Sequence, residues 1–275
     1  MPELPETETI ARDLDASVRG RTIVDVSVTR PDVLRGITAE QLRSRVVGAR
    51  VERCWRRAKL VVLDLSTGDR VVVQPRFTGA LLLDAGQLPE RERAYSTLAF
   101  TLDDHRRLHY RDIRRLGTVS LMPPDEFRAY AGALGPEPLD PHFTVAQLAG
   151  LLRSSRQAVK KLLMDQRRLV GVGNIYANEA LWRAGIDPAR PARSVSDDEM
   201  ARLHTGIRSV LTESIAHRGT SFRDYVDTNG AAGGFTAHLQ AYGRGGAPCA
   251  RCGTPLAETH AIDGRTTVWC QRCQT

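Results

Sequence analysis

The chain has 275 residues, 41% of them hydrophobic, which is enough for one large domain or two ordinary ones. It contains no run of about 18 apolar residues and no charged-then-apolar leader, so neither a membrane span nor a secretory signal is indicated, and we expect a cytoplasmic protein. The net charge of +7 favours a polyanionic partner. Residues 1–150 hold 22 Lys or Arg against 21 Asp or Glu, whereas residues 151–275 hold 17 against 11, so the basic excess lies late in the chain.

The chain opens with MPELPE, residues 1–6. A small second residue usually permits removal of the initiator Met, so Pro2 is expected to become the N-terminus, with an α-amino pKa of roughly 7.7–8.0. Its unprotonated secondary amine can attack an electrophilic carbon, and Glu3, with Glu6 one helical turn further on, can move protons. The alternative is an ordinary helix start, because Pro and Glu are both favoured in a first helical turn. Taken alone, the hexapeptide favours that alternative.

The periodicity of the following residues changes once along the chain. A helix over residues 5–19 precedes segments of period two at 22–28, 49–55 and 98–102 and short apolar runs at 60–63 and 71–73, which together predict an antiparallel sandwich or barrel. From residue 125 the spacing is helical, over 125–134, 144–152, 155–164, 175–184 and 196–217, with Thr144, Ser155 and Ser196 as candidate N-caps. The sequence therefore predicts an α+β chain in which strands precede helices.

Four cysteines near the end of the chain have the spacing of a zinc site. They are Cys249, Cys252, Cys270 and Cys273, in a CxxC-x17-CxxC pattern. A pair of disulfides or coincidence are the alternatives, and the missing secretion signal argues against disulfides. Because four thiolates fill a zinc tetrahedron, one structural Zn²⁺ is predicted. Arg265 lies between the two cysteine pairs. It either contacts a phosphate or a groove of a nucleic acid, or it is an ordinary solvated turn residue.

Three further places carry candidate DNA contacts. The Gly-rich segment VGVGNIYA (170–177) leads into a helix, where Asn174 can cap the helix and reach a phosphate. Lys59 is the one lysine in the first 150 residues, and it has either a specific role or a solvated place at a strand end. Arg114 could read a base edge while Leu116 wedges between bases.

These pieces occur in an order that resembles bacterial formamidopyrimidine-DNA glycosylase, in the family shared with endonuclease VIII. The resemblance covers essentially the whole chain through PELPE (2–6), RRAK (56–59), LGPEPL (134–139), LMD (163–165), VGVGNIYA (170–177) and the paired CxxC. It implies an N-terminal catalytic β-sandwich domain with a leading helix (1–122). It further implies a helical DNA-binding domain with a helix–two-turn–helix and a lesion-covering loop (123–240), and a β-hairpin zinc finger (241–275).

The resemblance also implies an activity on double-stranded DNA that contains oxidised bases or abasic sites. Pro2 would form a Schiff base at C1′ and Glu3 would move protons, so that oxidised purines (8-oxoguanine and formamidopyrimidines) are excised and the strand is cut by β,δ-elimination. Glu6 would position the N-terminal segment. Residues 219–225 match the loop that covers an oxidised guanine, which favours the purine-specific branch.

The remaining site residues follow from the same resemblance. Lys59, Asn174 and Arg265 match positions that grip phosphates around the flipped nucleotide, and Lys59 is counted with Pro2 and Glu3 among the catalytic residues. Tyr176 belongs to the same DNA-binding motif as Asn174, and Arg114 matches the residue that faces the orphaned cytosine. The DNA is expected between the two main domains, with a monomeric protein acting in the bacterial cytoplasm on nucleoid DNA.

Departures from the family pattern include two of the probing residues. Phe77 stands where Met is usual, and Leu116 stands where Phe is usual. Both positions keep an apolar side chain that can fill the space left by the flipped base, so we expect the protein still to probe the duplex. The range of lesions and the preferred opposite base stay open. The alternatives are an oxidised-pyrimidine glycosylase of the endonuclease VIII kind and a catalytically silent protein that binds damaged DNA.

Overall fold

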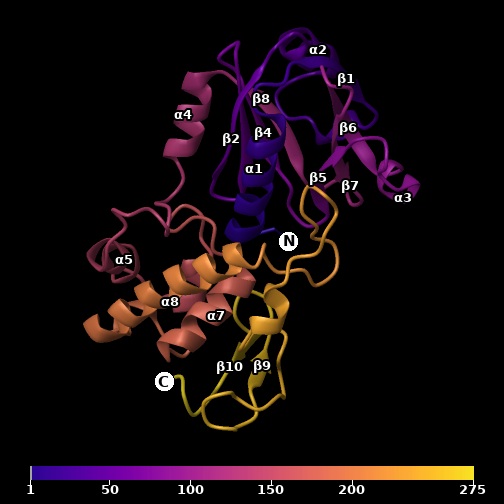
Figure 1. The fold of residues 1–275 in the computed structure, drawn as a ribbon. Coiled ribbons are helices and arrows are strands. Elements are labelled where there is room, and N and C mark those ends of the chain that lie inside the picture. Colours follow the sequence, from indigo (N-terminus) through magenta and orange to yellow (C-terminus); the bar gives the residue numbers. More distant parts are fainter. Residues whose placement is uncertain (1) are drawn as a thin grey trace. The chain divides into compact units, whose positions relative to one another are not determined.

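A computed structural model describes residues 2–275 (Figure 1). Contacts between residues divide the chain into two units, Met1–Gly132 with His217–Gly234, and Ala133–Ala216 with Phe235–Thr275. The segment His217–Gly234 therefore packs with the N-terminal unit, although it follows the helices in sequence. None of the helices formed by residues 2–275 has the length and apolar character needed to cross a bilayer.

The first unit contains two four-stranded antiparallel sheets. One has the strand order β1 (Ile23–Val28), β6 (Ser96–Leu102), β7 (Arg107–Asp112), β5 (Gly79–Asp84). The other has the order β2 (Val51–Arg57), β3 (Leu60–Leu65), β4 (Arg70–Gln74), β8 (Thr118–Met122). Its helices are α1 (Leu4–Val18), α2 (Ala39–Val46), α3 (Glu90–Arg93) and α4 (Pro124–Gly132), with a 3₁₀ turn at Pro31–Val33. The predicted antiparallel β-sandwich with a leading helix is confirmed.

Helix α1 packs on β2 and β3 through one apolar stripe. Ile10, Leu14 and Val18 are fully buried and lie four residues apart, so they share one helix face. They join one core with Phe100 and Tyr110, which are also buried. This packing fixes the start of α1, and with it the N-terminal segment, against the sheets.

The second unit is helical and ends in a two-stranded hairpin. Its elements are α5 (Val145–Leu152), α6 (Val159–Leu163), α7 (Asn174–Ala184), α8 (Asp197–Ala216), β9 (Ala257–Thr259) and β10 (Thr267–Trp269), with 3₁₀ turns at Ala192–Ser194 and Phe235–His238. Helices α7 and α8 approach closely at Gly206, where an added Cβ would lie 3.0 Å from the carbonyl oxygen of Ala180. The predicted helical domain followed by a β-hairpin is confirmed.

Two of the three predicted N-caps are confirmed. The Thr144 and Ser196 hydroxyls accept hydrogen bonds from the N–H groups of Gln147 and Glu199, at 3.2 and 3.3 Å. The cap at Ser155 was wrong, because α6 begins only at Val159. Residues 155–159 instead form backbone hydrogen bonds with residues 190–193, and this extended pairing replaces the first turn of the predicted helix.

Candidate functional site

The N-terminal segment is held at the start of α1 by the carboxylate of Glu6. One oxygen of Glu6 accepts a hydrogen bond from the backbone N–H of Glu3 at 2.8 Å, and the other accepts one from the N–H of Thr220 at 2.7 Å. Pro2 is buried, and Glu3 and Glu6 are 2% and 1% exposed. The predicted removal of the initiator residue concerns Met1, which lies outside the described residues.

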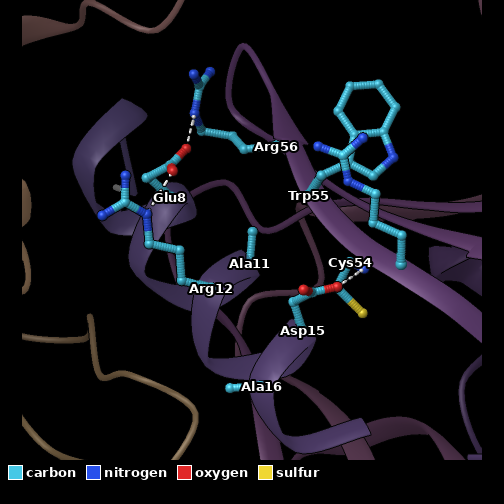
Figure 2. A pocket seen from close by; sticks show the side chains of 9 residues that line it. Glu8, Ala11, Arg12, Asp15, Ala16, Cys54, Trp55 and Arg56 are labelled. Carbon is cyan, nitrogen blue, oxygen red and sulfur yellow. Dashed lines mark hydrogen bonds and ion pairs between the residues drawn. The ribbon is translucent and has the colours of Figure 1, made fainter. Parts of the chain in front are cut away.

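The turn that carries Lys59 is tied to α1. Ala58 adopts a left-handed conformation, with φ of 55°, and its carbonyl oxygen accepts a hydrogen bond from Arg56 at 2.9 Å. Arg56 Nε also donates to the Glu8 carboxylate at 2.8 Å, and Arg12 contacts the same carboxylate at 2.7 Å (Figure 2). Although burial opposes the shift, the Arg56 charge and hydrogen bond hold the pKa of Glu8 below its usual value. The half-buried Lys59 is thereby placed on a turn anchored to the helix that follows Pro2 and Glu3.

The segment 219–225 is anchored to the same helix. Arg218, at its start, has φ of 63° and contacts Asp13 of α1 and Asp227 at 2.6 and 2.5 Å. The Tyr225 hydroxyl donates to the Arg218 carbonyl oxygen at 3.1 Å, and burial raises the pKa of this hydroxyl. Both ends of the segment are thus fixed within the first unit.

Two loops of the first unit expose the predicted probing residues. Phe77 and Leu116 are 44% and 47% exposed, although both are large and apolar. The Arg114 guanidinium lies over the Phe77 ring, with its central carbon 4.7 Å from the ring centroid. Arg114 and Phe77 therefore form one exposed cation–aromatic pair.

In the second unit, Asn178 connects the Gly-rich turn to the zinc hairpin. Its side-chain nitrogen donates to the Asn174 carbonyl oxygen at 2.6 Å and to that of Thr266 at 3.4 Å. Its side-chain oxygen accepts from the N–H of Val268 at 2.8 Å. Asn174, on one element, and Arg265, next to Thr266 on another, are therefore brought near each other.

Two details of this region concern Asn174, which was expected to cap the helix, and the buried Lys160. Asn174 is the first helical residue rather than the N-cap, because Gly173 occupies the cap position. Lys160 is fully buried, and its Nζ donates to the Thr266 carbonyl oxygen at 2.8 Å and the Thr267 hydroxyl at 2.7 Å. Lys160 thus supports the base of the hairpin tip that carries Arg265.

The four paired cysteines converge. The sulfur atoms of Cys249, Cys252, Cys270 and Cys273 all lie within 4.8 Å of one another. This cluster fits one Zn²⁺, since four thiolates complete a tetrahedral site, and the ion is structural because no position remains for substrate. Gly253, next to Cys252, and Gly264, next to Arg265, have φ of 72° and 64°, which glycine adopts without strain.

Family models match three consecutive parts of the chain. The N-terminal domain of formamidopyrimidine-DNA glycosylase matches residues 1–119, its H2TH domain matches 134–226, and a zinc finger found in FPG and IleRS matches 246–275. The chain belongs to the formamidopyrimidine-DNA glycosylase family. The resemblance inferred from the motifs is confirmed.

Relatives in this family match along their full length. The formamidopyrimidine-DNA glycosylase of Pelotomaculum thermopropionicum is 40% identical over 276 residues, which cover 100% of this chain and 99% of the relative. The crystal structure of MutM (Fpg) from Thermus thermophilus has 35% identity and a TM-score of 0.87, and the match covers 99% of this chain and 98% of that one. A Lactococcus lactis Fpg mutant in complex with DNA containing Fapy-dG has 30% identity and a TM-score of 0.92, with complete coverage of both chains.

The predicted site residues of this Fpg-family chain fall into two groups. Pro2, Glu3, Glu6, Lys59, Phe77, Arg114 and Leu116 belong to the first unit, and Asn174, Tyr176 and Arg265 belong to the second. Tyr176 is fully buried, and its hydroxyl shares a 2.6 Å hydrogen bond with Ser214, so its side chain packs inside the second unit. The roles of these residues remain predictions.

Three supporting residues were missed by the sequence analysis. Asn178, which binds Val268, and Asp112, which accepts a hydrogen bond from Thr78, join segments distant in sequence, and no local pattern marks them. Glu179, fully buried on α7, accepts three backbone N–H groups of residues 240–242 at 2.8–2.9 Å. The sequence signal for Glu179 is its place within a largely apolar helix, because a buried carboxylate needs hydrogen-bond donors.

Proposed function

We propose that this protein is a DNA glycosylase of base excision repair that removes oxidised purines from double-stranded DNA and cuts the strand at the resulting abasic site. The observation that carries this proposal is the full-length family match, which includes the N-terminal segment with Pro2 and Glu3. It is supported by Lactococcus lactis Fpg structures that hold Fapy-dG DNA and abasic-site DNA. The damaged nucleotide would be swung out of the duplex for the reaction.

The nucleophile in this proposal is the amine of Pro2 after removal of Met1. Its lone pair forms a bond to C1′ of the lesion nucleotide as the N-glycosidic bond breaks and the base leaves with a proton. The secondary amine then loses its one proton, and its lone pair expels the sugar ring oxygen to give an iminium. Loss of a C2′ proton breaks the C3′–O bond, and a second elimination breaks the C5′–O bond.

The other site residues hold or move protons and phosphates. Glu3 lies beside Pro2 and would carry protons at the sugar ring oxygen and at the leaving base. Lys59, Asn174 and Arg265 would bind phosphates around the flipped nucleotide, since each offers N–H donors. The Zn²⁺ ion stabilises the hairpin that presents Arg265 and takes no part in the reaction.

The proposal extends to organisation and location. Residues 1–122 would form the catalytic domain, 123–240 the helical DNA-binding domain and 241–275 the zinc finger. The protein would act as a monomer on nucleoid DNA in the bacterial cytoplasm.

Oxidised pyrimidines are a second candidate substrate class. A Lactococcus lactis Fpg structure, 29% identical with a TM-score of 0.91, is a complex with DNA containing an oxidised pyrimidine. The 219–225 segment matches the loop of the purine branch, so we place purines first.

Excision assays on duplexes with one defined lesion test this proposal. We expect 8-oxoguanine or formamidopyrimidine opposite cytosine to be excised faster than an oxidised pyrimidine, leaving a one-nucleotide gap with a phosphate on each side. A protein that binds abasic-site duplexes but leaves every lesion intact would be the silent DNA-binding alternative. Faster release of the oxidised pyrimidine would assign the endonuclease VIII kind of specificity.

A further inference from the structure

Two exposed loops of the first unit meet at one buried carboxylate. Asp112, at the end of β7, is 1% exposed and accepts hydrogen bonds from the Thr78 hydroxyl, from the N–H of Gly117 at 2.8 Å and from the Tyr110 hydroxyl at 3.3 Å. Thr78 belongs to the loop between β4 and β5, and Gly117 to the loop between β7 and β8. Asp112 therefore joins the loop that carries Phe77 to the loop that carries Leu116.

Thr78 makes a second link between the same loops. Its hydroxyl, which donates to Asp112, also accepts a hydrogen bond from the backbone N–H of Arg114 at 3.0 Å. The side chain of Arg111, on β7, also donates to the Thr78 carbonyl oxygen at 3.0 Å. The backbone of Arg114 is thus fixed from the neighbouring loop.

The loops also approach too closely to shift independently. A Cβ at Gly117 would overlap the Tyr110 hydroxyl and lie 2.6 Å from the carbonyl oxygen of Gln74. A Cβ at Gly79 would lie 2.7 Å from the Cα of Pro75. Close packing therefore requires both glycines, and at Gly117 it brings the second loop against the end of β4 and against Pro75 of the first loop.

The aromatic ring of Phe77, on the first of these loops, positions the Arg114 side chain. Its guanidinium lies 4.7 Å from the Phe77 centroid, and the ring quadrupole attracts the cation. A ring limits the rotation of a guanidinium stacked on it more than a flexible Met or Leu side chain would. If Phe77 only filled space in the duplex, any apolar side chain of similar volume would serve, and its stacking with Arg114 would not be needed.

We propose that Phe77, held through Thr78 and Asp112, presets the Arg114 guanidinium as a reader of the base opposite the lesion. Phe77 is then a positioning residue for specificity, and this inference rests on the proposed function. Arginine has donors and no acceptor. The pairing edge of cytosine offers two neighbouring acceptors, O2 and N3, whereas that of adenine offers N1 beside the N6 amino donor. A guanidinium fixed in orientation therefore favours cytosine, and a mobile one can turn away from the adenine amino group.

The ratio of kcat/KM for 8-oxoguanine opposite cytosine to that opposite adenine tests this. Phe77→Leu keeps an apolar filler but removes the ring, and we expect the ratio to fall roughly two- to fivefold, as loss of an exposed cation–π contact implies. Phe77→Tyr keeps the ring and should retain the ratio. Tyr130→Leu is the matched control, because it removes a 40% exposed ring from α4, and it should leave the ratio unchanged.

A double-mutant comparison separates positioning from simple filling. In an Arg114→Ala background, Phe77→Leu should change the ratio no further, because the reader is already lost. Thr78→Val, which removes the hydroxyl link, should lower the ratio while the protein remains folded. Equal losses against both opposite bases in Phe77→Leu, or an unchanged ratio, would overturn the proposal.

Binding to a stable abasic-site analogue keeps this test independent of catalysis. The Kd for a duplex with adenine opposite the analogue, divided by the Kd for a duplex with cytosine there, should fall in the same variants. A wild-type protein that discriminates in binding but excises nothing would sink the proposed excision, while the role of Phe77 in opposite-base discrimination could still be read from the binding ratios. A wild-type protein that excises 8-oxoguanine without preference for the opposite base would sink the inference alone.

Discussion

The Glu6 carboxylate accepts a hydrogen bond from the backbone N–H of Thr220, which lies 214 residues further along the chain, at 2.7 Å. Its second oxygen binds the N–H of Glu3. One buried side chain therefore holds both the segment that carries Pro2 and the start of the loop at 219–225. Because Glu6 is 1% exposed, neither donor can exchange its partner for water without local opening.

Glu6→Gln should uncouple these two segments. The side-chain amide keeps one acceptor oxygen and replaces the other by NH₂, so either Glu3 or Thr220 loses its partner. We expect the free energy of unfolding to fall by about 1–3 kcal/mol, the usual cost of a buried unsatisfied group, and excision to slow. Chemical denaturation and single-turnover assays measure both. Glu40→Gln, on the exposed side of α2, should change the unfolding free energy by less than about 0.5 kcal/mol, and an equally small effect at Glu6 would contradict this account.

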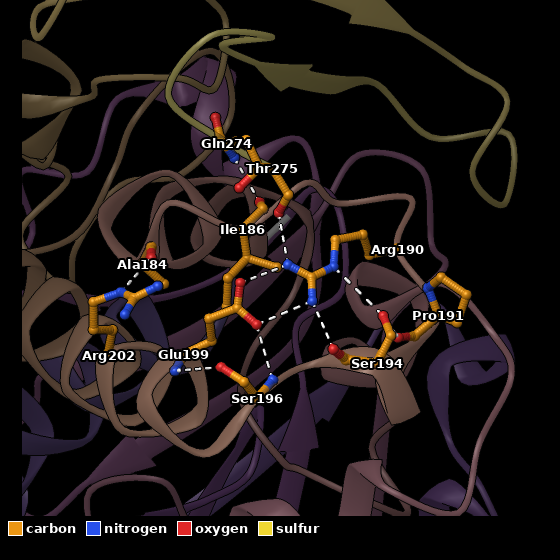
Figure 3. A network of polar contacts seen from close by, with 10 residues as sticks. All are labelled: Ala184, Ile186, Arg190, Pro191, Ser194, Ser196, Glu199, Arg202, Gln274 and Thr275. Atoms are coloured by element: carbon orange, nitrogen blue, oxygen red, sulfur yellow. Dashed lines mark hydrogen bonds and ion pairs between the residues drawn. The ribbon is translucent and has the colours of Figure 1, made fainter.

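The ion pair between Glu199 and Arg190 should make stability depend on acid pH (Figure 3). The hydrogen bond from Arg190, opposed by burial, lowers the pKa of Glu199 from 4.5 to about 2. A carboxyl whose pKa is lower in the folded state stabilises the fold above its unfolded pKa, and this contribution is lost as the pH falls from about 4.5 towards 2.

Glu199→Gln tests this pH dependence. The variant should lose about 1–2 kcal/mol of unfolding free energy near pH 7, and its difference from the wild type should shrink below about pH 4.5. Glu213→Gln breaks a pair with Arg183 at 2.6 Å in which the carboxylate is 49% exposed, so a loss below about 1 kcal/mol is expected. A difference for Glu199→Gln that stays constant from pH 7 to 3 would refute the assignment.

Zinc removal should unfold the C-terminal hairpin. The cysteine cluster packs with Trp182 and Val268, so loss of the ion would expose this small core and change tryptophan fluorescence. Metal analysis should find one zinc per chain, and Cys252→Ser should lose most of it. Cys54→Ala is the control, since Cys54 is buried in the first unit and should leave the zinc content unchanged. Two disulfides found by thiol titration, with no zinc, would contradict the site.

DNA affinity should fall steeply with salt. Each phosphate contact contributes about −0.9 to the slope of log K against log salt concentration on duplex DNA. Arg265→Ala should weaken binding and reduce the magnitude of this slope by about one. Arg91→Ala is a matched control because Arg91 is 83% exposed and lies on α3, which carries none of the predicted DNA contacts. A wild-type slope near zero would exclude the phosphate-binding roles.

Local patterns predicted most of the elements. Period-two segments and short apolar runs located β1, β2, β3, β4 and β6, and Thr144 and Ser196 identified helix starts because their hydroxyls satisfy backbone donors nearby in sequence. The zinc site was predicted from the spacing of the four cysteines alone. In each case, the deciding interaction joins residues that are close in sequence or have a fixed chemical pattern.

Long-range pairing accounts for what the sequence did not predict. The helix expected from residue 155 gave way to backbone bonds with residues 190–193. The bond from Thr220 to Glu6 and the contacts of Asp112 depend on the folded sandwich rather than on any neighbouring residue. The stacking of Arg114 on Phe77 likewise required the two loops to be seen together.

Borohydride trapping on duplex DNA with 8-oxoguanine opposite cytosine tests the central claim most directly. If Pro2 is the nucleophile, reduction of its iminium should give a stable covalent complex of protein and DNA. Peptide mapping should place the link at residue 2, and a retained N-terminal tag should abolish the adduct while Arg91→Ala leaves it unchanged. An adduct that persists at full yield when the N-terminus is blocked would contradict the account.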